Sequence, residues 1–250
     1  MPNNYMFFSF LLTILSGIST LIGYFFIYIK GNKNNIISSS LGFASGIMIT
    51  ISIIDLIPNA FLLIFKQYSN HTIFIILMAF IFGIIVSSII DKKIEKRSKN
   101  GLKLYKLGII TMVVIVLHNI PEGIATFITA NNNIKLGITL TIAIALHNIP
   151  EGISISIPIY YATKSKFKSF LYTFISGMSE PLGALLAYLF LTKYVNDIVL
   201  GIIYSFIAGM MINIAINELF KEANEYNRRN SFIYFIVGMI IMVINHIFFG

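Results

Sequence analysis

The hexapeptide HNIPEG occurs twice in the chain, at His118–Gly123 and again at His147–Gly152, each time within a run of isoleucine, valine, leucine and alanine. On a helix, side chains four residues apart lie on one face, one turn from each other. The histidine and the glutamate of each copy therefore project together, and the asparagine lies at the edge of the same face. These polar donors are His118, Asn119, Glu122, His147, Asn148 and Glu151.

Three glutamates, Glu122, Glu151 and Glu180, lie deep in apolar runs that contain no lysine or arginine. A charged side chain at the centre of a bilayer costs at least about 2.5–3.5 kcal/mol on insertion scales. The three carboxyl groups must therefore be protonated, hydrated or paired with a cation that is not part of the chain. Imidazole with carboxylate suits Zn²⁺, whereas amide and carboxylate oxygens suit harder divalent ions. The pattern favours a site for divalent metal ions.

The proline of each hexapeptide cannot donate a backbone hydrogen bond. Pro121 and Pro150 are therefore expected to free the carbonyls of Leu117 and Leu146 and to kink both helices. Unpaired carbonyls at membrane depth are tolerated where they face a cavity. Two plainer interpretations remain open at this stage: the histidines only satisfy these carbonyls, or protonated glutamates only hold the helices together.

The composition indicates an integral membrane protein. The chain is 57% hydrophobic and 11% charged, whereas soluble domains are about 45–50% apolar and about 25% charged. The net charge of +8 comes from basic residues in loops and at span edges, so the expected partner is the lipid bilayer and not nucleic acid. The absence of cysteine excludes disulfides and thiolate metal ligands.

Apolar runs of spanning length predict eight transmembrane helices joined by short polar segments, with no separate soluble domain. The first run follows no basic segment or cleavage site, so we expect a retained span and not a signal peptide. Strand-like alternation is missing, and the expected fold is all-α. The runs cover residues 5–29, 38–65, 72–90, 107–129, 136–160, 169–192, 198–219 and 231–249.

The basic residues predict the orientation. With the N-terminus outside, fifteen of them fall in the inner loops and three, Lys66, Lys135 and Lys193, in the outer loops. Inner loops of membrane proteins are enriched in lysine and arginine, so both termini are predicted outside the cytoplasm. The fifteen inner residues are Lys30, Lys33, Lys92, Lys93, Lys96, Arg97, Lys99, Lys103, Lys106, Lys164, Lys166, Lys168, Lys221, Arg228 and Arg229.

Two further motifs recur at nearly the same offset. SGISTLIG from Ser16 matches SGMSEPLG from Ser176, and GIMITISIIDL from Gly46 matches GMMINIAINEL from Gly209. The first three predicted spans thus resemble the last three, and an odd shift of five spans makes the copies antiparallel. The two HNIPEG helices, spans four and five, are likewise antiparallel. Inverted repeats around a site at the membrane midplane are typical of secondary transporters.

Three more residues are candidates for an ion pathway. Asp55 and Glu218 occupy matched places in the second repeated motif but fall toward opposite sides of the membrane. They suit the entrance and the exit of a cation path, and equally suit ordinary interfacial carboxylates. Met48 lies in the same motif, seven residues before Asp55.

The segments HNIPEGIATFITA, ALHNIPEGISISIPIYYATKS and SGMSEPLGALLAYL resemble helices four to six of the ZIP family of metal-ion transporters, most closely its bacterial ZupT type. The resemblance implies a 3+2+3 bundle in the bacterial inner membrane, usually dimeric, that admits Zn²⁺ and often Fe²⁺, Mn²⁺, Co²⁺ or Cd²⁺. The metal would be a bound transported substrate and not a cofactor. The expected single transport domain, 1–250, comprises repeats at about 5–90 and 169–249 and a central helix pair at about 107–160.

The resemblance also implies two metal sites. The first would use His118, Glu122, His147 and Glu151, with Met48 as a further candidate, and the second Asn119, Glu122, Asn148, Glu151 and Glu180. The loop DKKIEKRSKNGLKLYK departs from many members of the family because it contains no histidine.

Two other classes of function remain open. An intramembrane metal-dependent hydrolase would also place histidine and glutamate in the membrane, but the chain has no HExxH, and doubled donors suit a pathway better than one catalytic water. A proton-coupled carrier of an organic substrate would be expected to show a basic or aromatic pocket at the midplane. We therefore expect a transporter and not an enzyme.

Overall fold

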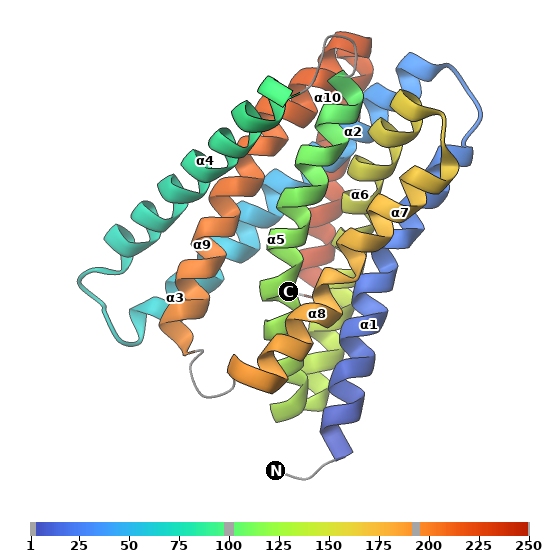
Figure 1. The fold of residues 1–250 in the computed structure, drawn as a ribbon. Coiled ribbons are helices and arrows are strands. Elements are labelled where there is room, and N and C mark those ends of the chain that lie inside the picture. Colours follow the sequence, from blue (N-terminus) through green and yellow to red (C-terminus); the bar gives the residue numbers. More distant parts are fainter. Residues whose placement is uncertain (1–3, 98–102, 192–195, 250) are drawn as a thin grey trace.

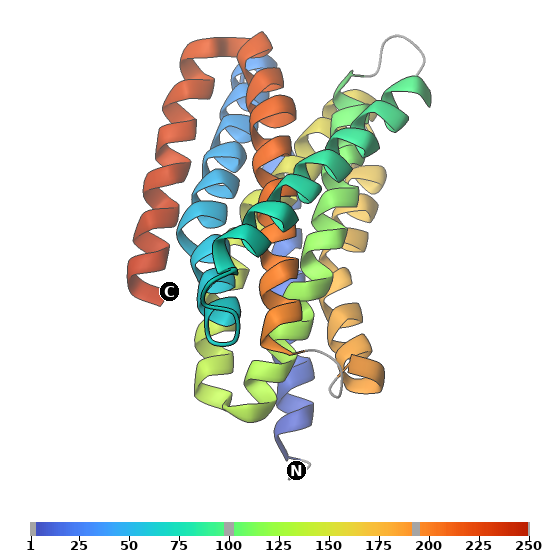
Figure 2. The same cartoon turned by 90° about the vertical axis from the view of Figure 1, so that its left-hand side faces the viewer.

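The computed structural model describes residues 4–97, 103–191 and 196–249, and the described residues contain helices and no strand. The helices form one elongated bundle, with the N-terminal end of α1 (Asn4–Tyr24) and the C-terminal end of α10 (Lys221–Phe249) directed to the same side (Figures 1 and 2). The sequence-predicted all-α class is confirmed for these residues. Lys99 and Lys193, which entered the loop count, lie outside the described residues.

The remaining elements follow one another with short connections. They are η1 (Phe25–Tyr28), α2 (Lys33–Ile51), η2 (Ser52–Leu56), α3 (Ile57–Phe65), α4 (Thr72–Arg97), α5 (Lys103–Asn132), α6 (Ile134–Thr163), α7 (Lys166–Gly177), α8 (Ser179–Leu186), η3 (Ala187–Leu191), α9 (Asp197–Ile214) and η4 (Ala215–Phe220). Several begin at capping side chains: Asn32, Asn133, Ser165 and Asn196 each accept a hydrogen bond from a backbone N–H of the first turn. Such caps satisfy donors that a helix leaves unpaired.

Within the described ranges, six helical segments are long and apolar enough to cross a membrane. This confirms the multi-pass character expected from the composition. The segments are Tyr5–Tyr28, Lys33–Phe65, Thr72–Lys93, Lys103–Asn132, Ile134–Thr163 and Asp197–Phe248.

The difference from the eight expected spans has two local causes. Met178 interrupts the apolar run that α7 and α8 share, so neither half reaches spanning length alone. Asn227, with extended backbone at φ −162° and ψ 100°, lies inside the 52-residue segment and turns the chain back on itself. Figure 2 shows the two arms of this last segment joined at one end of the bundle, with α2 packed against α10 and lying between the two arms. The helices α5 and α6, by contrast, run uninterrupted through Pro121 and Pro150.

Glycines of the repeated motifs bring helix backbones into close contact. A Cβ at Gly152 of α6 would overlap the Thr20 carbonyl of α1, and one at Gly123 of α5 would overlap the Glu180 carbonyl of α8. Thr20 and Glu180 are matched positions in the repeat, as are the glycines in the two hexapeptides. Small residues permit such approach between membrane helices. Each hexapeptide helix is thus held against one copy of the SGxS motif.

The second repeated motif also adopts matched structure. In both copies the α-helix loosens into a π-helical segment, η2 or η4, and each segment carries the acidic residue of its copy, Asp55 or Glu218. Single π-turns inside helices are rare and often lie at functional sites. Asp55 and Glu218, whose roles the sequence left open, therefore lie in equivalent segments of locally distorted backbone.

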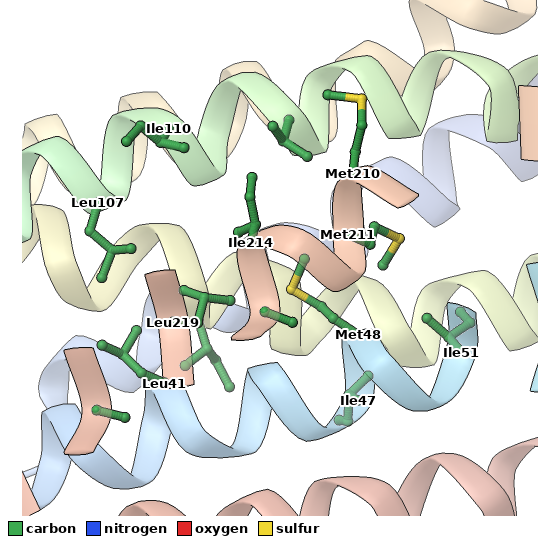
Figure 3. Close-up of a cluster of buried hydrophobic side chains, with 14 of the residues drawn as sticks. Leu41, Ile47, Met48, Ile51, Leu107, Ile110, Met210, Met211, Ile214 and Leu219 are labelled. Atoms are coloured by element: carbon green, nitrogen blue, oxygen red, sulfur yellow. The ribbon is translucent and has the colours of Figure 1, made fainter. Parts of the chain in front are cut away.

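The main apolar core lies between α2, α5 and α9 (Figure 3). Met48 from α2 lies in this cluster together with Met210 and Met211 from α9, and all three are at most 1% exposed. Met48 and Met211 are matched positions in the repeat. Unbranched methionines fill irregular gaps in such cores.

Candidate metal centre

The seven donors expected from the sequence come from three helices and all are buried. Their exposed fractions lie between 0 and 5%. α5 contributes His118, Asn119 and Glu122, α6 contributes His147, Asn148 and Glu151, and α8 contributes Glu180. Buried polar groups are costly unless they are paired or hold an ion. Packing alone therefore does not explain why these seven polar side chains are buried together.

Two histidines and two glutamates form the nearest set of donors. The Nε2 atom of His118 lies 3.0 Å from Oε1 of Glu122, one turn along α5, and 3.5 Å from Oε1 of Glu151 on α6. The Nε2 atom of His147 lies 3.1 Å from the same Glu122 oxygen. Glu122 is thus shared between the histidines of both hexapeptides. The pairing that helical spacing predicted within the first copy is observed, and the contacts between copies come from the packing of α5 against α6.

One ligand atom each from His118, His147 and Glu151 lie within 4.8 Å of one another. Zinc bonds to histidine nitrogen and carboxylate oxygen are about 2.0–2.2 Å long, so two ligands of one ion are at most about 4 Å apart. Small side-chain movements would bring these three atoms onto one ion. The donor types, imidazole and carboxylate, are those that Zn²⁺ accepts.

The asparagines are anchored through their amide nitrogens. Asn119 donates to the carbonyl of Ser176, at 3.2 Å, and Asn148 donates to the carbonyl of Ser16, at 3.1 Å. These serines are matched positions in the SGxS repeat. Among the described residues neither asparagine Oδ1 has a hydrogen-bond partner. The amide of Asn119 is therefore oriented by the second copy of the SGxS motif and that of Asn148 by the first copy. Each amide oxygen remains free to act as a ligand.

Glu180 joins the two hexapeptide helices to α8. Its Oε1 atom accepts a hydrogen bond from Asn148, whereas its Oε2 atom has no partner within the described part of the chain. Both carboxylate oxygens of Glu151 and one of Glu122 are likewise without hydrogen bonds there. Several buried acceptors thus converge without donors, which is the arrangement that a divalent cation would satisfy.

The charge balance supports a cation as the missing partner. Among the described residues, the ion pairs of the buried glutamates involve only His118 and His147, and none involves lysine or arginine. Leaving a buried charge uncompensated is strongly destabilising. Three carboxyl groups in one centre therefore need protons or a metal ion.

The three candidates for the ion pathway lie in three different elements of the structure. Asp55 in η2 is partly exposed, accepts a hydrogen bond from Asn59 at 2.7 Å and interacts electrostatically with His147. Glu218 in η4 lies near the other end of the bundle, close to Asp91 of α4. Met48 lies in the apolar cluster described above.

Sequence reasoning missed three participants. Ser16 and Ser176 orient the asparagines through backbone carbonyls, which residue type does not reveal, although their recurrence in the SGxS motif was a signal. Tyr204 of α9 lies within electrostatic range of both Glu122 and Asp55. No sequence pattern distinguished it from the other tyrosines.

The chain is similar to known transporters over almost its whole length. The family model "ZIP Zinc transporter" matches residues 91–246. The Zinc transporter ZupT of Streptococcus mutans serotype c is 39% identical, with 99% of each chain covered. That of Clostridium perfringens is 38% identical over 96% of this chain and 95% of the relative, and that of Oceanobacillus iheyensis is 38% identical over 96% and 97%. This chain is a multi-pass membrane protein that belongs to the ZIP family of metal-ion transporters.

Proposed function

We propose that this protein takes up zinc into the cytoplasm, and that iron, manganese, cobalt or cadmium ions follow the same route. The observation that carries the proposal is the convergence of seven buried nitrogen and oxygen donors from α5, α6 and α8, with no lysine or arginine paired to the glutamates among the described residues. Relatives named as zinc transporters support zinc as the main substrate. The ion is cargo and not a resident cofactor.

Two adjoining metal positions account for all seven donors. The first is made by His118 and His147 with the carboxylates of Glu122 and Glu151, and the second by the two asparagine oxygens with Glu180 and the same two carboxylates. Glu122 and Glu151 would bridge the two ions. Nitrogen-rich coordination at the first position suits Zn²⁺, whereas oxygen-only coordination at the second also suits Fe²⁺ and Mn²⁺.

A path connects these positions to both sides of the membrane. Asp55 would attract cations at the outer entrance and Glu218 would receive them at the inner exit. Their equivalent π-helical segments support matched roles, because both backbones are distorted at the acidic residue.

The proposed organisation is an eight-span bundle in a bacterial inner membrane, arranged 3+2+3, with both termini outside and two copies forming a homodimer. In it, α7 with α8 makes the sixth span, and Asn227 separates the seventh from the eighth. The inverted repeats, about 5–90 and 169–249, flank the central pair at about 107–160 in one transport domain. The matched glycine contacts support this symmetry.

Uptake by proteoliposomes tests the function. Purified protein reconstituted into vesicles should accumulate Zn²⁺ from outside, with measurable uptake of Fe²⁺, Mn²⁺, Co²⁺ and Cd²⁺ and none of Mg²⁺ or Ca²⁺, because nitrogen ligands disfavour hard ions. Empty vesicles are the control. Vesicles that take up no divalent metal, or that export it only, would contradict the proposal.

The topology can be mapped with single cysteines, because the chain has none of its own. Cysteine at Tyr5, Asn70 or Phe248 should react with a membrane-impermeant maleimide on intact cells. Cysteine at Gly31 or Arg228 should react only after permeabilisation. Equal labelling of Tyr5→Cys and Arg228→Cys on intact cells would rule out the orientation.

The two metal positions should differ in selectivity. His147→Ala removes a nitrogen ligand, so we expect Zn²⁺ uptake to fall at least roughly tenfold more than Mn²⁺ uptake. Glu180→Ala removes an oxygen ligand of the second position and should show the opposite bias. Initial rates for both ions in both variants provide the measurement. Equal losses for both ions in both variants would mean that the positions are not functionally distinct.

A further inference from the structure

A groove with a volume of about 640 Å³ opens on the side of the bundle, where α2 and α10 meet η1 and α6. Its volume lies in the range of about 300–1,000 Å³ that is typical of ligand sites. It is separate from the metal centre and contains none of the seven donors. Its lining combines amide and hydroxyl side chains with apolar ones, as a site for an amphipathic molecule would.

The groove runs lengthwise along two helices. On α10 it is lined by Asn230, Tyr234, Val237 and Ile241, which recur every three or four residues and form one stripe. At 1.5 Å per residue, the stripe is about 16 Å long. The hydrocarbon core of a bilayer is about 30 Å thick, so the groove is as long as one leaflet is deep.

The amide side chains of the lining gather at one end of this length, where Phe26, Ile29 and Ile36 also line the groove. Asn32, Asn35 and Asn230 line the end nearest the turns of the chain, whereas Phe43, Ile153 and Ile241 line the deeper part. The first three carry amide groups that hydrogen-bond well to phosphate and ester oxygens. The deeper part offers only apolar contact. This order matches a headgroup, a glycerol region and an acyl chain.

Two serine hydroxyls in the groove are available for a ligand. Ser38, Ser45, Thr50 and Ser52 on the same helical segment each donate to a backbone carbonyl. Ser39 and Ser40, which line the groove, make no such bond within the described residues. Serine and threonine hydroxyls on membrane helices normally donate to a backbone carbonyl. The hydroxyls of Ser39 and Ser40 therefore differ from their neighbours in remaining available to a ligand.

Basic residues flank the polar end of the groove in the sequence. Three exposed ones, Lys30, Lys33 and Arg229, directly adjoin lining residues, and exposed Arg228 lies two residues before Asn230. No acidic residue is among the described residues that line the groove. Basic pockets between membrane helices attract anionic lipid headgroups.

We propose that this groove binds one anionic glycerophospholipid, with its phosphate at the asparagines and basic residues and one acyl chain between α2 and α10. The lipid would belong to the leaflet at that end of the bundle, which is cytoplasmic in the orientation proposed above. Its chain would touch Ile153, two residues beyond Glu151 on α6. The bound lipid would therefore contact the helix that carries metal donors and stabilise the junction of that helix with α2 and α10.

Lipid retention in detergent tests the site. The purified protein, exchanged into detergent with equal amounts of phosphatidylglycerol and phosphatidylcholine, is analysed by native mass spectrometry. We expect phosphatidylglycerol to remain bound in preference. Ser40→Trp and Ile241→Trp fill the groove and should reduce retention roughly tenfold, whereas Ile240→Trp is the matched control, because Ile240 is exposed on the same helix but does not line the groove. The pair Arg228→Gln and Arg229→Gln should each weaken the preference roughly fivefold.

Several results would overturn the proposal. Equal retention of the two lipids would exclude recognition of the anionic headgroup. Equal loss in Ile240→Trp and Ile241→Trp would exclude the groove as the site. If Ile241→Trp instead dissociated a dimer without changing bound lipid, the occupant would be a second copy of the chain. Because retention is measured without transport, failure here and failure of zinc uptake are distinguishable.

Discussion

Replacing Glu122 or Glu151 by alanine is expected to reduce zinc uptake at least about a hundredfold while the protein stays in the membrane. Mutation of a residue that merely orients a metal ligand lowers metal affinity about 10- to 100-fold. In the proposed centre Glu122 would bind the ion itself, and one of its oxygens lies 3.0 Å from Nε2 of His118 and 3.1 Å from that of His147. Its loss would remove the only acidic group in contact with both imidazoles among the described residues. Initial rates in proteoliposomes, normalised to protein content, measure the effect.

The matched control for this prediction is Glu225→Ala. Glu225 is exposed and paired with Lys103 at 3.0 Å, so its removal should leave uptake near the wild-type rate because exposed ion pairs contribute little. Near-wild-type uptake by both Glu122→Ala and Glu151→Ala would remove these carboxylates from the transport site. Glu122→Gln separates charge from shape, and we expect it to be nearly as inactive as Glu122→Ala.

Gly152→Ala should be the most damaging single change to packing. Its Cβ would overlap the backbone carbonyl of Thr20, and backbone cannot rotate away as a side chain can. Overpacking costs about 1–3 kcal/mol, and we expect the upper end here, since α1 must move away from α6. The melting temperature in detergent should fall by roughly 5–10 °C. Displacement of α1 would also release Asn148 from the Ser16 carbonyl and so impair uptake.

Gly31→Ala is the control for this change. A Cβ there would meet only the Ile36 side chain, at 3.7 Å, so its melting temperature should remain within about 1 °C of the wild-type value. Gly123→Ala should behave like Gly152→Ala, because it overlaps the matched carbonyl of Glu180. An unchanged melting temperature in both hexapeptide variants would mean that these helices are not held by backbone contact.

Local features of the protein were predictable because they depend on spacing along one helix. The approach of His118 to Glu122 follows from the four-residue separation, and the extent of the apolar runs follows from bilayer thickness. Helix ends were less predictable. The second apolar run was expected from residue 38, but α2 begins at Lys33, because Asn32 caps a polar first turn that hydropathy does not register.

The number of separate spanning segments could not be predicted from the apolar runs alone. Eight apolar runs are present in the sequence, yet a turn at Met178 divides one run, and a single extended residue, Asn227, both joins and reverses two others. Apolar content measures how much chain can lie in a membrane. It does not specify where the backbone bends, because a bend requires only one residue to leave the helical region.

By itself the sequence determined which donors this protein has: two histidines, two asparagines and three glutamates in apolar surroundings without a lysine or arginine. That inventory follows from residue type and burial cost alone. Only the tertiary structure decided how they combine. The sharing of Glu122 by His118 and His147 requires that the antiparallel helices α5 and α6 bring their two hexapeptides to the same depth along the bundle. The orientation of Asn119 and Asn148 depends on serine carbonyls more than fifty residues away, and carbonyls are common to every residue, so only the fold could select Ser16 and Ser176.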